Sequence, residues 1–250
     1  MGPFASYPSL SGRTVFITGG ATGIGAALVQ AFCAQGARVG FLDINAQAGA
    51  ALSDPIPNAW FWHCDVTDPT ALKTVLAAAE YELGPIRVLV NNVADDSRHA
   101  VEDLTPEAWR ANLAVNLDPV LQASLAVQPG MRAAGGGSII NLSSINARLG
   151  PPDLAAYTAA KGAVDALGRS LARAWGGDNI RVNAVAPGWV VTERQLALWL
   201  TPEAENEWMK QVALRWRIEP PDIARLVLFL AADDSAMITG QVLTIDGGRT

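Results

Sequence analysis

Two side chains that can exchange a proton, Tyr157 and Lys161, lie four residues apart in this chain of 250 residues. In a helix, that spacing puts both side chains on one face, about one turn apart. A phenol with its unperturbed pKa of about 10 is a poor base near neutral pH. Nearby cations such as the Lys161 ammonium would favour the phenolate, and a shift of about 3 units in pKa corresponds to roughly 4 kcal/mol. The pair therefore suits removal of the hydroxyl proton when an alcohol is oxidised.

Two further polar residues add weight to a pair that is common by chance. Ser144 lies thirteen residues before Tyr157, at the end of a predicted strand, where it would hold the substrate oxygen. Open α/β sheets bind ligands beside the carboxyl ends of their strands, which favours this position. Asn116 lies inside a long predicted helix earlier in the chain. We therefore expect a catalytic group of four residues, Asn116, Ser144, Tyr157 and Lys161.

A glycine-rich turn near the start of the chain predicts a nucleotide site. The segment 18–25 reads Thr-Gly-Gly-Ala-Thr-Gly-Ile-Gly, with a predicted strand before it and an alanine-rich helix after it. Glycine at 19, 23 and 25 would permit the tight turn and let backbone N–H groups approach a pyrophosphate at the helix N-terminus. A glycine-rich turn without a ligand is the simpler interpretation, but the strand and helix around it make that less favourable. Five residues of this turn are expected to bind a dinucleotide: Gly19, Thr22, Gly23, Ile24 and Gly25.

Asp43 closes the second predicted strand, 24 residues after Gly19. A carboxylate at this place would accept hydrogen bonds from the two hydroxyls of the adenosine ribose and repel a 2′-phosphate. The position therefore favours NAD over NADP. A second interpretation is that Asp43 caps a helix that begins after Ile44, and the two roles are compatible.

The elements around these residues alternate between β-branched runs and stretches of helical period. Strands are predicted at Thr14–Thr18, Val39–Asp43, Trp60–Cys64, Arg87–Asn91, Ser138–Leu142, Arg181–Ala186 and Val242–Ile245. Helices are predicted at Ile24–Gln35, Pro69–Leu83, Pro106–Met131, Leu154–Trp175 and Pro221–Ala231. The alternation indicates an α/β fold: one doubly wound Rossmann-type domain with a seven-stranded parallel sheet. The segment 190–218 lies outside the alternation and is expected to be a small helical lid over the substrate.

Composition excludes several classes of partner. The formal charge is −6, and half the residues are hydrophobic. No basic patch predicts binding to nucleic acid or to an anionic membrane, so a small neutral substrate is expected. The two cysteines, Cys33 and Cys64, have neither a disulfide framework nor metal-ligand spacing around them. We therefore expect a cytoplasmic protein without a metal site.

Taken together, these motifs resemble the short-chain dehydrogenase/reductase family from Leu10 to Gly248. The resemblance adds Asp65-Val66, Asn91-Asn92, Pro187-Gly188, Thr192 and Ile245-Asp246-Gly247-Gly248, all in the order and spacing of the family. It implies that Tyr157 is the acid/base, that Lys161 lowers its pKa and binds the nicotinamide ribose, and that Ser144 orients the substrate. Asn116 would hold a water molecule in a proton relay.

The same resemblance extends the expected dinucleotide site and predicts the assembly. It places Asp65 and Val66 at the adenine and Asn92 near the nicotinamide ribose. Pro187, Val190 and Thr192 would surround the carboxamide, Val190 through its backbone. A homotetramer is expected, because most relatives are tetramers.

Within the family, the chain is most similar to bacterial NAD-dependent aldose 1-dehydrogenases. The similarity lies in Tyr7-Pro8-Ser9-Leu10, Phe41-Leu42-Asp43-Ile44, Arg98-His99 and the segment 187–195. A sugar needs several converging hydrogen-bonding groups and an aromatic face. Besides Ser144 and Tyr157, the expected substrate residues are Asp95, His99, Trp189 and Gln195, and Asp96, Glu193 and Trp199 are also candidates.

Two other functions remain open on the sequence. One is reduction of 3-oxoacyl or other apolar carbonyl compounds, which Asp43 and the net charge of −6 disfavour. The other is a dinucleotide-sensing protein without turnover, which would not need the complete set of four catalytic residues. The favoured reaction is transfer of a hydride from C1 of an aldose to NAD, giving an aldonolactone.

Overall fold

The fold was described from a computed structural model that covers residues 5–250. All strands of its sheet are parallel, in the order β3-β2-β1-β4-β5-β6-β7. The strands are β1 (Thr14–Thr18), β2 (Arg38–Asp43), β3 (Ala59–His63), β4 (Val88–Asn91), β5 (Gly137–Leu142), β6 (Ile180–Pro187) and β7 (Val242–Ile245). The seven predicted strands are confirmed, each to within one residue at either end. The predicted doubly wound parallel sheet is confirmed with them.

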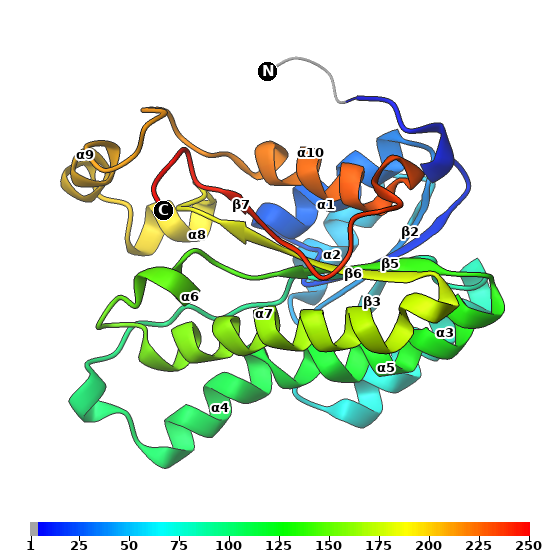
Figure 1. The fold of residues 1–250 in the computed structure, drawn as a ribbon, viewed down its shortest axis with the longest axis horizontal. Coiled ribbons are helices and arrows are strands. Elements are labelled where there is room, and N and C mark those ends of the chain that lie inside the picture. Colours follow the sequence, from blue (N-terminus) through cyan, green and yellow to red (C-terminus); the bar gives the residue numbers. More distant parts are fainter. Residues whose placement is uncertain (1–4) are drawn as a thin grey trace.

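Helices cover both faces of the sheet (Figure 1). One layer holds α1 (Gly23–Ala34), α2 (Ala46–Ser53) and α10 (Pro220–Ala231); the other holds α3 (Pro69–Leu83), α4 (Pro106–Asn116), α5 (Asp118–Ala133) and α7 (Ala155–Trp175). Successive strand side chains alternate between the faces. In β1, Val15 and Ile17 join the core under α1 and α10, whereas Phe16 joins the core under α3 and α5. Burial on both faces explains the nearly continuous apolar strands.

The predicted long helix Pro106–Met131 is wrong, because the chain breaks there into α4 and α5. At the break, Leu117 has φ −124° and ψ −54°, outside the helical region. Pro119 opens α5 at its first turn. Proline has no N–H to donate to the preceding turn, and its ring clashes with that turn, so a helix can begin but not continue there. Asn116 is therefore the last residue of α4 rather than an interior residue of a long helix.

Three shorter helices lie near the carboxyl end of the sheet: α6 (Asn146–Leu149), α8 (Glu193–Leu198) and α9 (Pro202–Met209). The last two belong to the segment between β6 and α10, and Figure 1 shows them beyond the sheet at the end where β6 finishes. The side chains of Thr192 and Thr201 cap the two helices by accepting hydrogen bonds from the backbone N–H groups of Gln195 and Ala204. Within residues 5–250, none of the helices has the length and apolarity needed to cross a bilayer.

Candidate active site

A cavity of about 770 Å³ opens at the carboxyl end of the sheet. Its volume lies within the range of about 300 to 1,000 Å³ that is usual for small-molecule sites. The wall runs from the glycine turn after β1, past the ends of β2 and β4, to β5, α7 and α8. This is the place where the strand order changes direction along the chain, from β1 to β4. Doubly wound sheets bind ligands at such a switch point.

The turn from β1 into α1 requires glycine. Gly19 and Gly23 have φ angles of +67° and +54°, a region that residues with a side chain rarely adopt. Gly25 packs so close to the turn that a Cβ there would lie 1.9 Å from the Gly19 carbonyl oxygen. The Asn92 side-chain amide holds the turn from the other side, since its Nδ2 donates to that same oxygen at 2.8 Å. The N-terminus of α1 therefore faces the cavity with its backbone N–H groups accessible to an anion.

Asp43 ends β2 at the wall of the cavity. Its Oδ2 accepts from the Ala21 N–H at 3.0 Å and its Oδ1 from the Asn45 N–H at 2.9 Å. A carboxylate has about four acceptor positions, so it can still accept from the hydroxyls of a ribose. The helix-capping role considered for Asp43 belongs to Asn45, whose side chain accepts from the Ala48 N–H of α2.

Asp65 follows β3 on the same wall. Hydrogen bonds from the Thr67 N–H and hydroxyl lower the pKa of its carboxyl. The wall also contains every residue expected to bind a dinucleotide: Gly19, Thr22, Gly23, Ile24, Gly25, Asp43, Asp65, Val66, Asn92, Tyr157, Lys161, Pro187, Val190 and Thr192.

Tyr157 and Lys161 both lie on α7, on the buried face expected from their spacing. The Lys161 ammonium lies 5.6 Å from the centre of the Tyr157 ring and donates to the Leu142 carbonyl at 2.7 Å. Burial lowers the pKa of Lys161 to about 8. Burial also raises the pKa of Tyr157 to about 12, although a hydrogen bond with Ser144 acts in the opposite direction. In the cofactor-free protein, the raised pKa keeps the Tyr157 hydroxyl protonated at neutral pH.

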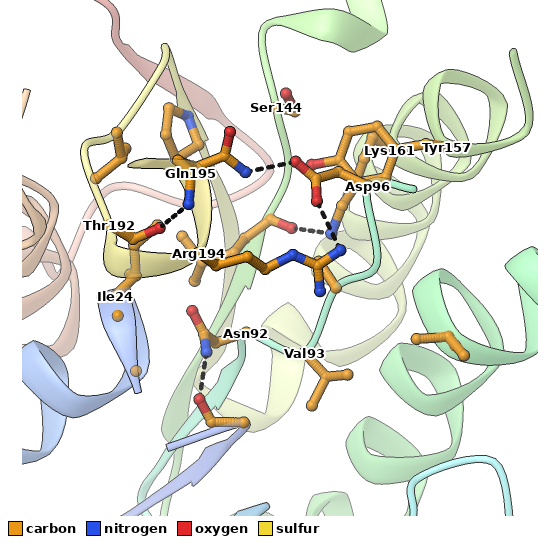
Figure 2. A pocket seen from close by; sticks show the side chains of 18 of the residues that line it. Ile24, Asn92, Val93, Asp96, Ser144, Tyr157, Lys161, Thr192, Arg194 and Gln195 are labelled. Atoms are coloured by element: carbon orange, nitrogen blue, oxygen red, sulfur yellow. Dashed lines mark hydrogen bonds and ion pairs between the residues drawn. The ribbon is translucent and has the colours of Figure 1, made fainter. Parts of the chain in front are cut away.

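Ser144 comes two residues after β5 and lines the same cavity. Its Oγ accepts from the Asn146 N–H at 3.1 Å, which fixes the hydroxyl at the start of α6. Ser144, Tyr157 and Lys161 thus meet on one wall, as Figure 2 shows.

Asn116 is fully buried, and the described wall of the cavity does not include it. Its Oδ1 accepts from the Asp95 N–H at 2.9 Å, and its Nδ2 donates to the Asp95 carbonyl at 3.0 Å. The Asn116 amide therefore clamps the backbone of the loop that follows β4, a role that the sequence did not indicate.

Polar side chains gather at the end of the cavity beside α8, which is called the substrate end below (Figure 2). They are Asp96 of the loop after β4 and Arg194 and Gln195 of α8. Gln195 on α8 accepts from Trp189 Nε1 at 2.7 Å. It donates to Asp96 Oδ2, also at 2.7 Å, a contact that Figure 2 shows. Arg194 Nη2 lies 3.2 Å from Asp96 Oδ1 and 3.0 Å from Asp95 Oδ1. These contacts join α8 to the loop after β4.

Two of the expected substrate residues, Asp95 and His99, lie outside the described wall of the cavity. The Asp95 carboxylate accepts from the Ser97 N–H and hydroxyl and pairs with Arg194. Trp199 is outside the wall as well and stacks under Arg98, with 4.6 Å from the guanidinium carbon to the ring centre. Trp189 and Gln195 line the cavity.

Sequence reasoning missed Arg194, Arg98 and Trp208 as parts of the site. Arg194 meets its partner Asp95 across 99 residues of sequence. Trp208 lies on α9 and packs edge-on against Trp189, with ring centres 5.8 Å apart. No spacing in the sequence signals either contact. The first forms only when α8 meets the loop after β4, and the second only when α9 packs on the residues that follow β6.

Comparison with known proteins supports the class that the fold and site define. A family model described as enoyl-(acyl carrier protein) reductase matches residues 19–250. A probable galactose dehydrogenase of Rhizobium meliloti (strain 1021) is 44% identical over 98% of both chains. A D-xylose 1-dehydrogenase of Caulobacter vibrioides is 45% identical, again over 98% of both. A solved 7α-hydroxysteroid dehydrogenase, in complex with NADH and a 7-oxo bile acid, superposes with a TM-score of 0.93 at 32% identity, covering 97% of this chain and 96% of the other.

The class of protein is defined by the parallel sheet, the glycine turn and the cavity wall formed by Ser144, Tyr157 and Lys161 (the Ser-Tyr-Lys wall). These features are those of a dinucleotide-dependent oxidoreductase. The chain belongs to the short-chain dehydrogenase/reductase family.

Proposed function

We propose that this protein is an NAD-dependent aldose 1-dehydrogenase that oxidises the anomeric carbon of a sugar to an aldonolactone. The observation that carries the proposal is the meeting of Ser144, Tyr157 and Lys161 with a polar substrate end in one cavity. The galactose and D-xylose dehydrogenases that are 44% and 45% identical to the chain support the choice of sugar.

The residues of the cavity fit a dinucleotide. The absence of a Cβ at Gly25 lets α1 pack against the turn after β1, and the N-terminus of α1 lines the cavity, which suits a pyrophosphate. Asp43 has acceptor capacity left for the ribose hydroxyls, and its charge disfavours the 2′-phosphate of NADP. The cations on the described wall, Arg98, Lys161 and Arg194, come from elements other than β2. We therefore propose NAD as the cofactor, as in the NADH complex of the structural relative.

The proton is handled by three side chains of this chain. Ser144 Oγ hydrogen-bonds the reacting hydroxyl of the substrate and orients it toward Tyr157. Tyr157 Oη takes the proton from that hydroxyl while the C–H bond of the carbon that carries the hydroxyl breaks. The bound NAD supplies the hydride acceptor. The Lys161 ammonium stabilises the Tyr157 phenolate, and its hydrogen bond to the Leu142 carbonyl holds it in place.

The α8–α9 segment is proposed to act as a lid of a single Rossmann-type domain. Arg194 and Gln195 of α8 contact Asp95 and Asp96 across the substrate end, so movement of α8 would open or close it.

We further propose a homotetramer, by resemblance to the family. The free thiols of Cys33 and Cys64 fit a reducing compartment such as the cytoplasm.

Two other functions compete with this proposal. The description of the matching family model, an enoyl-(acyl carrier protein) reductase, favours an apolar acyl substrate. Asp96, Arg194 and Gln195 at the substrate end disfavour it, because an apolar ligand would cover these polar groups without using the hydrogen-bonding positions that their mutual contacts leave. A protein that senses a dinucleotide without turnover has no use for the Ser-Tyr-Lys wall.

A spectrophotometric screen tests the proposal. Aldoses, polyols, secondary alcohols and 3-oxoacyl thioesters are each supplied with NAD(H) and with NADP(H), and the absorbance of the reduced nicotinamide is followed. We expect the highest kcat/KM with an aldose and NAD. A higher kcat/KM on apolar alcohols or 3-oxoacyl thioesters than on every aldose would refute the sugar substrate, and no turnover at all would favour the sensor.

A further inference from the structure

A carboxylate lies beside the catalytic tyrosine at the substrate end of the cavity. Asp96 comes from the loop between β4 and α4, and its side chain faces Tyr157 of α7 (Figure 2). Its negative charge favours the protonated form of both Tyr157 and Lys161, adding to the effect of burial on the pKa of Tyr157 and opposing the larger effect of burial on the pKa of Lys161. The proposed oxidation therefore takes place beside a charge that opposes the phenolate, unless a hydrogen bond to Asp96 disperses that charge.

Asp96 has fixed partners and acceptor capacity to spare. Oδ2 accepts from Gln195 Nε2 at 2.7 Å, and Oδ1 lies 3.2 Å from Arg194 Nη2. About four acceptor positions surround a carboxylate, so these two partners leave others for a ligand. The side chain is 28% exposed, and it lines the cavity. Asp96 is thus held rigidly and still accessible to a substrate hydroxyl.

Gln195 supplies a donor next to this acceptor. Its amide is fixed at both ends, because Oε1 accepts from Trp189 Nε1 at 2.7 Å while Nε2 donates to Asp96. An amide NH2 carries two N–H donors, and the contact with Asp96 uses one of them. A carboxylate acceptor beside an amide donor matches a hydroxyl group, which donates and accepts at once.

We propose that Asp96 determines substrate specificity by accepting a hydrogen bond from the hydroxyl on the carbon next to the reacting carbon, with Gln195 donating to the same hydroxyl. The inference rests on the proposed function and goes one step further, since it names the sugar hydroxyl that is recognised. In the proposed reaction Ser144 and Tyr157 hold the reacting oxygen. Asp96 faces Tyr157 from the other side of the cavity wall, so a substituent on the neighbouring carbon is the one placed next to Asp96. An alcohol without this hydroxyl would leave a partly buried carboxylate without its partner.

The adjacent residue Asp95 offers a matched control. Both carboxylates pair with the same Arg194 nitrogen, at 3.0 Å for Asp95 and 3.2 Å for Asp96. Only Asp96 belongs to the described wall of the cavity. A change at Asp95 therefore weakens the contact between α8 and the loop after β4 without removing the proposed hydroxyl acceptor.

The test compares each sugar with its 2-deoxy analogue. The kcat/KM values for D-galactose, 2-deoxy-D-galactose, D-xylose and 2-deoxy-D-xylose are measured with NAD for the wild type, Asp96→Ala, Asp96→Asn and Asp95→Asn. We expect the wild type to prefer the better parent sugar by about 10- to 100-fold over its analogue, and Asp96→Ala to bring that ratio close to one. The intrinsic reactivities of the two sugars cancel when the ratios of two enzymes are compared.

The outcomes separate this inference from the proposed function. An equal loss on both sugars in Asp96→Ala, with the ratio unchanged, would show that Asp96 acts only through the fold or the lid and would overturn the inference. The same holds if Asp95→Asn lowers the ratio as much as Asp96→Ala does. If Asp96→Ala does not fold, Asp96→Asn takes its place, since it keeps the shape of the side chain but loses its charge. A lower ratio of parent sugar to 2-deoxy analogue than in the wild type supports the inference, and an unchanged ratio overturns it. Absence of turnover on every aldose of the screen, with turnover of other alcohols, would overturn the proposed function and this inference with it.

Discussion

Tyr157 and Lys161 have pKa values that burial moves in opposite directions. The Lys161 side chain is only 1% exposed, and its pKa is lowered to about 8, while the pKa of Tyr157 is raised to about 12. Burial disfavours the charged form of each group. It therefore raises the pKa of Tyr157, which is charged when deprotonated, and lowers the pKa of Lys161, which is charged when protonated. A further positive charge beside Tyr157, such as that of the nicotinamide ring, would lower the pKa of its hydroxyl. The proton step is therefore expected to depend on the bound cofactor.

Replacement of Tyr157 by phenylalanine keeps the ring in its buried position and removes only the ionisable oxygen. We expect kcat to fall by at least the factor of about 10² to 10⁴ that is typical for loss of a general base. Affinity for NAD, measured by titration of protein fluorescence, should change little. Retention of a tenth of the wild-type kcat would show that another group accepts the proton.

Lys161 also links the stability of the cofactor-free protein to pH. Its folded pKa of about 8 lies below the unfolded value of 10.5, so the unfolded chain binds more protons between these two values. The Lys161 contribution to the free energy of unfolding therefore increases as the pH rises from about 8 toward 10, by up to about 1.4 kcal/mol per pH unit.

Urea unfolding of the wild type and of Lys161→Met from pH 7 to pH 10 measures this contribution. The difference between the two free energies of unfolding cancels the titration of other groups, such as Cys33, whose pKa is raised to about 12. We expect the difference to move in favour of the wild type with rising pH. A difference that stays constant would mean that Lys161 titrates at its ordinary pKa.

Among the elements, the junction of β1 and α1 has the tightest steric requirement. A Cβ at Gly25 would meet the Gly19 carbonyl oxygen at 1.9 Å and Asn92 Nδ2 at 2.9 Å. The contacts are with the backbone and with a side chain that is itself held by the turn, so relief requires α1 to move away from β1. The close packing of α1 on β1 therefore requires a residue without a Cβ at position 25.

Gly25→Ala should lower the free energy of unfolding and weaken NAD binding together, because α1 both packs on the sheet and directs its N-terminus into the cavity. Gly162→Ala in α7 is the matched control, since a Cβ there meets nothing within 4 Å. That change should stabilise the protein by up to about 1 kcal/mol through helix propensity. Thermal unfolding and an NAD titration of both variants provide the measurement, and equal effects of the two changes would contradict the packing account.

At the scale of the whole molecule, the strand order decides which residues share the cavity. The order β3-β2-β1-β4-β5-β6-β7 brings the carboxyl ends of β1, β2, β4 and β5 to one edge. Asp43 and Ser144 thereby line one cavity although 101 positions separate them in the sequence. The cofactor and substrate ends of the site are thus parts of one surface of the sheet.

Replacement of Asp43 by alanine tests the cofactor end. We expect the preference for NAD over NADP, as a ratio of kcat/KM values, to narrow, because the hydrogen bonds to the ribose and the repulsion of the 2′-phosphate are lost together. Asp54 in the loop after α2 is a control position, since Asp54→Ala removes the same charge outside the described wall of the cavity. An unchanged ratio in Asp43→Ala, or equal kcat/KM values of the wild type with NAD and NADP, would contradict the assignment.

The sequence alone determined the elements and the class of chemistry. Short apolar runs rich in β-branched residues, alternating with helical stretches, predicted all seven strands, because side chains buried on both faces of a parallel sheet must be apolar whatever lies across from them. The glycines of the turn after β1 and the spacing of Tyr157 and Lys161 are local features, so their meaning can be derived from neighbours in the sequence. The long helix Pro106–Met131 failed because a hydrophobic period does not register that Pro119 can start a helix but not continue one.

Only the tertiary structure decided which polar side chains line the cavity. Asp95 and Asp96 are adjacent in the sequence, but the Asn116 amide fixes the backbone of Asp95, and only Asp96 lines the cavity. Arg194 and Gln195 acquire their partners when α8 meets the loop after β4, nearly one hundred residues away. Such contacts form between loops that the folded sheet brings together, and loop side chains have no periodicity from which their direction can be derived.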